Sequence, residues 1–125
     1  MDELRRKKIL VVEDNEDLGN ILRIQLESSG FSVQLKTNGL SAVDYASSHP
    51  LDLVILDLRL PDISGYQVCK ELRKVYHPWV LPILMLTAMD KPFDQLRGFA
   101  HGADAYLTKP HQPKELLRTV DLLLE

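Results

Sequence analysis

The stretch Leu51-Asp52-Leu53-Val54-Ile55-Leu56-Asp57 decides the fold of this chain. It is the most apolar segment of the sequence, and it ends abruptly on a carboxylate. A short, largely apolar run is typical of a parallel strand that is covered by helices on both faces. We therefore predict a buried strand over Leu51–Leu56, with Asp57 at its carboxyl end.

Similar short runs recur on both sides of this stretch, and longer segments with helical period separate them. Capping residues, glycines and prolines indicate where the helices begin and end. The expected strands are Ile9–Val12, Phe31–Leu35, Leu51–Leu56, Leu81–Leu86 and Ala103–Leu107. The expected helices run from about Asn15 to Gly30, from Leu40 to Ser48, from Tyr66 to Tyr76 before Pro78, from Phe93 to Ala100, and onward from Pro113.

Strands that alternate with helices imply a parallel α/β sheet with helices on both faces. Right-handed crossovers then favour a doubly wound, flavodoxin-like five-stranded sheet of order 2-1-3-4-5. The 125 residues fit one domain, 1–125, around one core. The residues of the first helix that follow the helical period are Leu18, Ile21, Leu22, Leu26 and one polar residue, Gln25.

Composition and charge exclude several classes of protein. A net charge of −3 gives the chain no overall attraction for nucleic acid or acidic membranes, and the basic run Arg5–Lys8 is short enough to be a solvated lead-in. No segment has the length of a membrane span or the pattern of a signal peptide. The single cysteine, Cys69, cannot form an internal disulfide and is expected to be buried in a helix. We expect a cytoplasmic domain without direct nucleic-acid or membrane contacts.

Polar side chains follow four of the five predicted strands. Glu13 and Asp14 follow the first strand, and Asp57 follows the third; Thr87 comes after the fourth, and Lys109 just after the fifth. In an open parallel sheet, ligands bind beyond the carboxyl ends of the strands, where the strand order reverses. The three carboxylates should therefore converge there, with Thr87 and Lys109 beside them.

Three carboxylates in one small cleft need a partner of opposite charge. Two unit charges about 4 Å apart repel by about 4 kcal/mol at an effective dielectric constant of 20. All-oxygen ligands suit Mg²⁺, which also binds phosphate oxygens. A cation, a lysine and a hydroxyl around one carboxylate could stabilise a transferring phosphoryl group, and carboxylates form aspartyl phosphates. Each residue alone could be a helix cap or a solvated side chain, so the joint placement carries this interpretation.

Four stretches of the chain resemble the receiver domain of two-component response regulators. They are Ile9–Asp14, Leu53–Gly65, Leu86–Ala88 and Gly102–Pro110, and their order and spacing make the resemblance specific. The resemblance implies a signalling phosphoacceptor that catalyses only its own phosphorylation and dephosphorylation. It also implies a histidine kinase or a phosphotransfer protein as donor, and a separate partner or a covalently linked effector domain as output.

The resemblance also implies roles for individual residues of the metal site. Asp57 would be the phosphorylated aspartate and, with Asp14, a ligand of Mg²⁺, for which Mn²⁺ could substitute. Glu13 would act on the cation through water. The backbone carbonyl of Arg59 would complete the set of metal ligands.

The switch residues follow from the resemblance in the same way. Thr87 would bond the phosphoryl group through its hydroxyl, and Lys109 would be the counter-ion, aimed by a cis Lys109–Pro110 peptide. Tyr106 would move inward after Thr87 and bias the surface of the fourth helix, fifth strand and fifth helix. That surface would bind the output partner, and it could also form a homodimer.

Other classes fit the residues less well. An aspartate-nucleophile phosphatase of the haloacid-dehalogenase type would need a general-acid aspartate two residues after the nucleophile, where this chain has Arg59, and its nucleophile would follow the first strand. A dinucleotide-binding domain would need Gly-x-Gly-x-x-Gly after the first strand, and this pattern is absent. A phosphate-independent binding module with the receiver fold stays open. The chain also departs from the family at His111, where a phenylalanine is common.

Overall fold

Five parallel strands form one sheet in the order β2-β1-β3-β4-β5, which confirms the predicted doubly wound topology. The computed structural model describes residues 6–76 and 80–125, so Arg5 of the basic run and the predicted helix stop at Pro78 lie outside the described residues. The strands are β1 (Lys8–Val12), β2 (Ser32–Lys36), β3 (Leu53–Leu56), β4 (Ile83–Thr87) and β5 (Ala105–Thr108).

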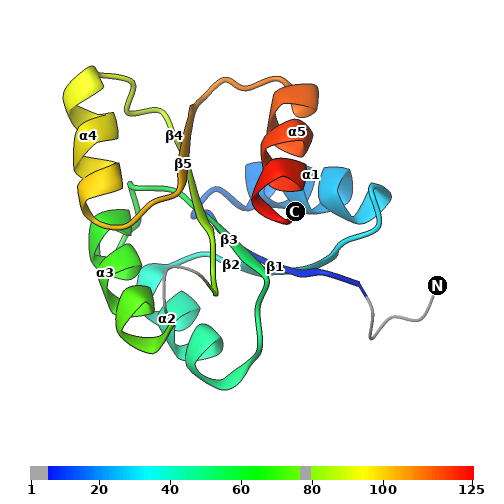
Figure 1. The fold of residues 1–125 in the computed structure, drawn as a ribbon, viewed down its shortest axis with the longest axis horizontal. Coiled ribbons are helices and arrows are strands. Elements are labelled where there is room, and N and C mark those ends of the chain that lie inside the picture. The colour runs from blue at the N-terminus through cyan, green and yellow to red at the C-terminus, as the bar shows by residue number, and fades with distance from the viewer. Residues whose placement is uncertain (1–5, 77–79) are drawn as a thin grey trace.

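Helices cover both faces of the sheet, as Figure 1 shows. α1 and α5 pack on one face, and α2, α3 and α4 lie on the other. Successive strand residues point to opposite faces of the sheet. β1 therefore contributes Ile9 and Val11 to the core cluster beneath α1 and α5, and Leu10 and Val12 to the cluster beneath α2 and α3. The helices are α1 (Glu16–Ser28), α2 (Gly39–Ser48), α3 (Gly65–Val75), α4 (Pro92–Ala100) and α5 (Pro113–Leu123).

Helix ends follow the local signals of the sequence. The side chain of Asn15 accepts a hydrogen bond from the N–H of Leu18 at 3.1 Å and caps α1. Gly30 follows the C-cap residue of α1 with φ of 95°, a left-handed conformation that glycine adopts without strain.

Cys69 is fully buried, and burial raises the pKa of its thiol to about 11. Among the described residues, no helix is long and apolar enough to cross a bilayer.

Three strands begin two residues later than the sequence indicates. β3 begins at Leu53 and β4 at Ile83, because the ladder between them starts with Val54 opposite Ile83. Pro82 lies just before β4; it has no N–H to donate, but its carbonyl accepts from the N–H of Val54 at 3.1 Å. β5 likewise begins at Ala105 instead of Ala103.

Ile21 follows the helical period of α1 but does not face the core. Its side chain is 51% exposed, whereas Leu22 and Leu26 are almost completely buried. Ile21 lies beyond the edge of the packed face and lines a shallow apolar groove with Leu18 and Pro110. Helical period alone therefore gives the direction of the buried face of α1 but overestimates its width.

The loop between β3 and α3 is fastened to α2 by Asp62. The carboxylate of Asp62 accepts hydrogen bonds from the N–H groups of Gly39 at 2.8 Å and Leu40 at 2.7 Å, at the amino end of the helix. Slight desolvation acts to raise the pKa of Asp62, but the bonds from Leu40 and Gly39 outweigh it and hold the pKa below its ordinary value of 3.8. The charged form of Asp62 therefore stabilises the fold.

Asp62→Asn should make the fold less sensitive to acid. Because the native pKa is depressed, the stabilisation is present above the unfolded value of 3.8 and is lost as the pH falls through the lower native pKa. Urea unfolding near neutral pH and at about pH 3 should show a smaller acid-induced loss of stability in Asp62→Asn than in the wild type. Asp121→Asn, at an exposed position on α5, is the control. Equal losses in the wild type and Asp62→Asn would contradict the prediction.

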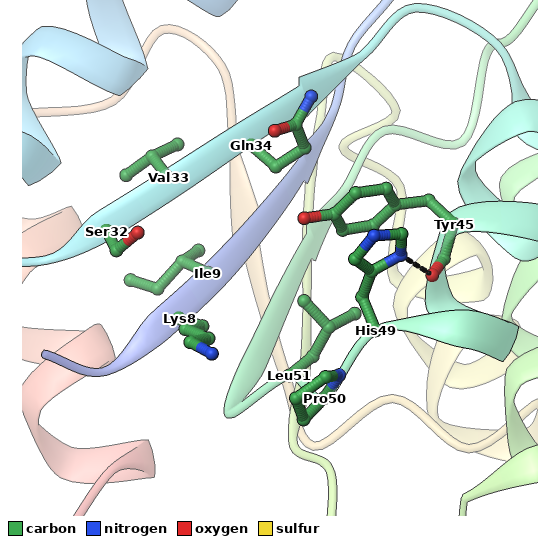
Figure 2. Close-up of a pocket in the computed structure, with 9 residues that line it drawn as sticks. All are labelled: Lys8, Ile9, Ser32, Val33, Gln34, Tyr45, His49, Pro50 and Leu51. Carbon is green, nitrogen blue, oxygen red and sulfur yellow. Dashed lines mark hydrogen bonds between the residues drawn. The ribbon is translucent and has the colours of Figure 1, made fainter. Parts of the chain in front are cut away.

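A small cavity of about 140 Å³ lies at the amino ends of β1 and β2 (Figure 2). The polar residues that follow the strands lie at the opposite, carboxyl ends. The rings of Tyr45 and His49 stack there, with centroids 3.9 Å apart. The Nδ1 atom of His49 also makes a hydrogen bond of 2.9 Å with the carbonyl of Tyr45. Stacking on each other and a hydrogen bond within α2 and its C-cap therefore already engage these two side chains.

Candidate functional site

The residues predicted from the strand ends meet at the carboxyl edge of the sheet. Backbone hydrogen bonds hold these ends in register, because the N–H of Asp57 donates to the carbonyl of Val12 at 3.0 Å and the N–H of Lys109 donates to that of Thr87 at 2.8 Å. Asp57 is therefore fixed beside the end of β1, and Lys109 beside the end of β4. This is the reversal point of the strand order, where ligands of open parallel sheets bind.

Three carboxylates form a compact acidic group at this point. Glu13, Asp14 and Asp57 each offer an oxygen, and these oxygens lie within 4.8 Å of one another. Glu13 and Asp57 are buried, at 3% and 6% exposed, whereas Asp14 is exposed. The N–H of Arg59 donates to Oδ1 of Asp57 at 3.2 Å and helps to orient that carboxylate. The group is open to solvent on the side of Asp14.

Lys109 bridges two of the three carboxylates. Its Nζ lies 2.8 Å from Oδ2 of Asp57 and 2.5 Å from Oε1 of Glu13. Desolvation acts to lower the pKa of Lys109, but the hydrogen bonds to Asp57 and Glu13 outweigh it and raise the pKa above its ordinary value. The ammonium therefore stays charged at neutral pH. The peptide bond between Lys109 and Pro110 is cis, as predicted.

The site keeps an excess of negative charge despite Lys109. Three carboxylates and one ammonium leave a formal charge of −2. Burial raises the pKa of Glu13, and the hydrogen bond from Lys109 only partly opposes this effect. A divalent cation would balance the charge, and a donor set made only of oxygens is the kind that hard cations such as Mg²⁺ and Mn²⁺ prefer. The residues present therefore fit a metal site of this type.

The side chains of Thr87 and Tyr106 both form hydrogen bonds with the backbone of Met89. Thr87 is fully buried, and its Oγ1 accepts from the N–H of Met89 at 3.4 Å. The hydroxyl of Tyr106 donates to the carbonyl of Met89 at 2.7 Å. Desolvation, then the nearby Tyr66 and carboxylates, raise the pKa of Tyr106 to about 12, so the phenol stays a donor. The sequence alone does not single out Met89, because only its backbone N–H and carbonyl make these two hydrogen bonds.

Gly65 packs directly against the backbone of the loop that follows Asp57. It begins α3 directly behind the loop that follows Asp57, and a Cβ on Gly65 would lie 2.3 Å from the carbonyl oxygen of Asp57 and 2.6 Å from the Cα of Leu58. Only glycine permits this close approach. The backbone carbonyl of Arg59, in the same loop, stays a prediction as a metal ligand.

Comparisons with known proteins agree with this geometry. The response regulator receiver domain family matches residues 9–121. The chain is 43% identical over 118 residues to the alkaline phosphatase synthesis transcriptional regulatory protein PhoP of Bacillus subtilis, covering 94% of this chain and 48% of that protein. It therefore spans about half the length of the curated relatives that it matches.

Solved structures show the same fold. A two-component response regulator from Clostridium difficile superposes with a TM-score of 0.90 at 30% identity, covering 95% of this chain and 96% of that one. The BeF3-activated receiver domain of DrrB gives a TM-score of 0.87 at 30% identity, covering 95% and 97%. The dehalogenase-type and dinucleotide-binding alternatives are thereby set aside. The chain belongs to the response regulator receiver domain family, whose members are signalling phosphoacceptors rather than enzymes acting on a separate substrate.

Proposed function

We propose that the chain accepts a phosphoryl group on Asp57, in a Mg²⁺-dependent reaction, from the phosphohistidine of a histidine kinase or phosphotransfer protein. The observation that carries the proposal is the contact of Lys109 Nζ with Oδ2 of Asp57, at 2.8 Å, inside an acidic group whose oxygens lie within 4.8 Å. A buried carboxylate that is paired with a lysine and adjoins two further carboxylates is suited to phosphoryl transfer.

The transfer is a displacement at phosphorus. A carboxylate oxygen of Asp57 forms the new bond to phosphorus, the bond from phosphorus to the donor imidazole breaks, and its electron pair stays on that imidazole. Lys109 and the hydroxyl of Thr87 stabilise the added negative charge. Glu13, Asp14, Asp57 and the carbonyl of Arg59 would hold Mg²⁺, or Mn²⁺ in its place, which when bound neutralises phosphoryl oxygens.

The output surface is formed by α4, β5 and α5. The phosphoryl group favours the inward position of Thr87, and Tyr106 follows through the Met89 backbone. α4 exposes Phe93 and Leu96, at 70% and 69%, so a change in its position would alter an apolar surface that a partner could bind. A homodimer through the same surface is a second use of it.

The effector on which this surface acts is either a separate partner or a covalently linked domain. The relatives are about twice as long as this chain, and one of them is named as a transcriptional regulatory protein, which supports a linked effector. We further propose that residues 1–125 act as one receiver domain, a proposal that the family match over 9–121 supports. The cytoplasmic location stays a prediction.

Mg²⁺ should be required for modification of the chain by a small phosphodonor. After incubation with acetyl phosphate and Mg²⁺, intact mass should show one added phosphoryl group, and peptide mapping should place it on Asp57. Excess EDTA should remove the adduct signal, because the formal charge of −2 at the site would then repel the donor. Bound Mg²⁺ without any adduct, from acetyl phosphate or a kinase panel, would favour a phosphate-independent binding module instead.

A further inference from the structure

One residue of α4, Gly98, is buried against the sheet. Gly98 is the only buried residue of this helix, whereas Phe93, Leu96 and Phe99 are exposed. A helix that contributes no large side chain to the core gains little free energy from its position, because burial of apolar side chains is the main source of such stabilisation. What lies beneath Gly98 therefore has a large influence on where α4 sits.

The ring of Tyr106 lies directly beneath Gly98. A Cβ at position 98 would be 3.1 Å from both Cδ2 and Cε2 of Tyr106, and 2.8 Å from Sδ of Met85. Carbon atoms in favourable contact are about 3.5–4.0 Å apart. The Tyr106 ring thus occupies space that a side chain at position 98 would need.

Of the two neighbours, Tyr106 is the one that can leave. Met85 is fully buried within β4, directly opposite Tyr106 in the strand register. Tyr106 is half-buried on β5, which is an edge strand of the sheet. Its ring can turn toward solvent at the cost of its hydrogen bond to the carbonyl of Met89.

We propose that Gly98 is a positioning residue: its missing side chain holds open the inner position of Tyr106 and so sets the affinity of the site for a phosphoryl group. The connection runs from the Tyr106 hydroxyl to the backbone of Met89 and from there to Oγ1 of Thr87. This inference rests on the proposed function, in which an inward Thr87 is the state that the phosphoryl group favours. Alanine at position 98 would favour the outward Tyr106 and oppose that state.

The first test compares Gly98→Ala with Gly19→Ala. Gly19 is a buried glycine of α1 whose added Cβ would meet only side-chain atoms of Leu35, at 2.8 and 2.9 Å, so this control has a similar crowding and the same gain in helix propensity. Tyrosine ring carbons are labelled for NMR, and Tyr106→Phe identifies the Tyr106 signal. In Gly98→Ala a soluble paramagnetic agent should broaden that signal more than in the wild type and Gly19→Ala. Equal broadening in all three proteins would overturn the inference.

The second test measures the affinity for beryllofluoride, a phosphoryl mimic, in the presence of Mg²⁺. Gly98→Ala should bind it about five- to tenfold more weakly than the wild type, at the low end of typical coupling between sites, while Gly19→Ala stays within about twofold. In a Tyr106→Ala background, alanine at position 98 should change the affinity by less than about twofold, because the ring is gone. An undiminished effect in that background would show that Gly98 acts by another route.

The two tests separate the inference from the proposed function. If the wild type binds no beryllofluoride and forms no adduct with acetyl phosphate, the proposed function fails, and the exposure of the Tyr106 ring still reports whether Gly98 controls its position. If the wild type binds beryllofluoride and Gly98→Ala binds it equally well, the inference fails alone. The double variant also keeps the measurement interpretable if crowding in Gly98→Ala destabilises the fold.

Discussion

Asp57→Asn is expected to show no phosphoryl adduct after incubation with acetyl phosphate and Mg²⁺. The amide has no carboxylate oxygen to form the bond to phosphorus, and the substitution also removes one of the three acidic groups around the proposed cation. The fold should persist, because asparagine has nearly the same shape and Lys109 keeps its second partner, Glu13, at 2.5 Å. Intact mass spectrometry measures the adduct, and circular dichroism measures the fold.

A matched carboxylate elsewhere makes this result specific. Asp44→Asn removes an exposed charge from α2 and should form the adduct at the wild-type rate. An adduct on Asp57→Asn that maps to another residue of the acidic group would show that Asp57 is not the acceptor. If neither variant forms an adduct, the wild type run in parallel shows whether the donor reaction itself has failed.

Gly65→Ala should damage stability and phosphorylation together. The added Cβ would lie 2.3 Å from the carbonyl oxygen of Asp57, and backbone atoms cannot move aside as a flexible side chain can. Overpacking usually costs about 1–3 kcal/mol, and a backbone clash belongs at or above the upper end, with a fall in Tm on the order of 10 °C. The N–H of Gly65 also donates to the carbonyl of Leu58 at 2.9 Å, so the loop after Asp57 should shift.

Gly19→Ala is again the control, because its new Cβ would meet only the flexible end of Leu35. Thermal unfolding should separate the two variants clearly. At a temperature where both are folded, the rate of adduct formation from acetyl phosphate should fall in Gly65→Ala and not in Gly19→Ala. A Gly65→Ala protein with wild-type Tm and wild-type rate would mean that the loop tolerates displacement and that the close approach has no functional part.

The sequence predicts well the features that depend on pattern. Apolar runs and helical period define the order of the elements, and the polar residue after each strand indicates where Asp57 and Lys109 meet. The parallel arrangement turns these sequence positions into neighbours, because all carboxyl ends lie at one edge. This inference needs no knowledge of individual side-chain contacts.

What the sequence does not predict depends on contacts between distant parts of the chain. Period alone places Ile21 on the buried face of α1, but the width of that face is set by the sheet beneath it. Asp62 gives no sign that it caps a helix 22 residues away in sequence, at Leu40. Gly98 is one of six glycines, and only the tertiary structure shows that Met85 and the ring of Tyr106 occupy the space a side chain there would need.

The two sides of the acidic group differ in how much they resist displacement. The loop after Asp57 is held by the Arg59 N–H, by the bonds of Asp62 to α2 and by the close backbone contact at Gly65. The segment after β4 leads instead to a helix with one buried residue, Gly98. Any expansion of the site should therefore displace the segment after β4 more than the loop after Asp57. The work done on the chain by an added phosphoryl group should be transmitted in one direction, toward α4.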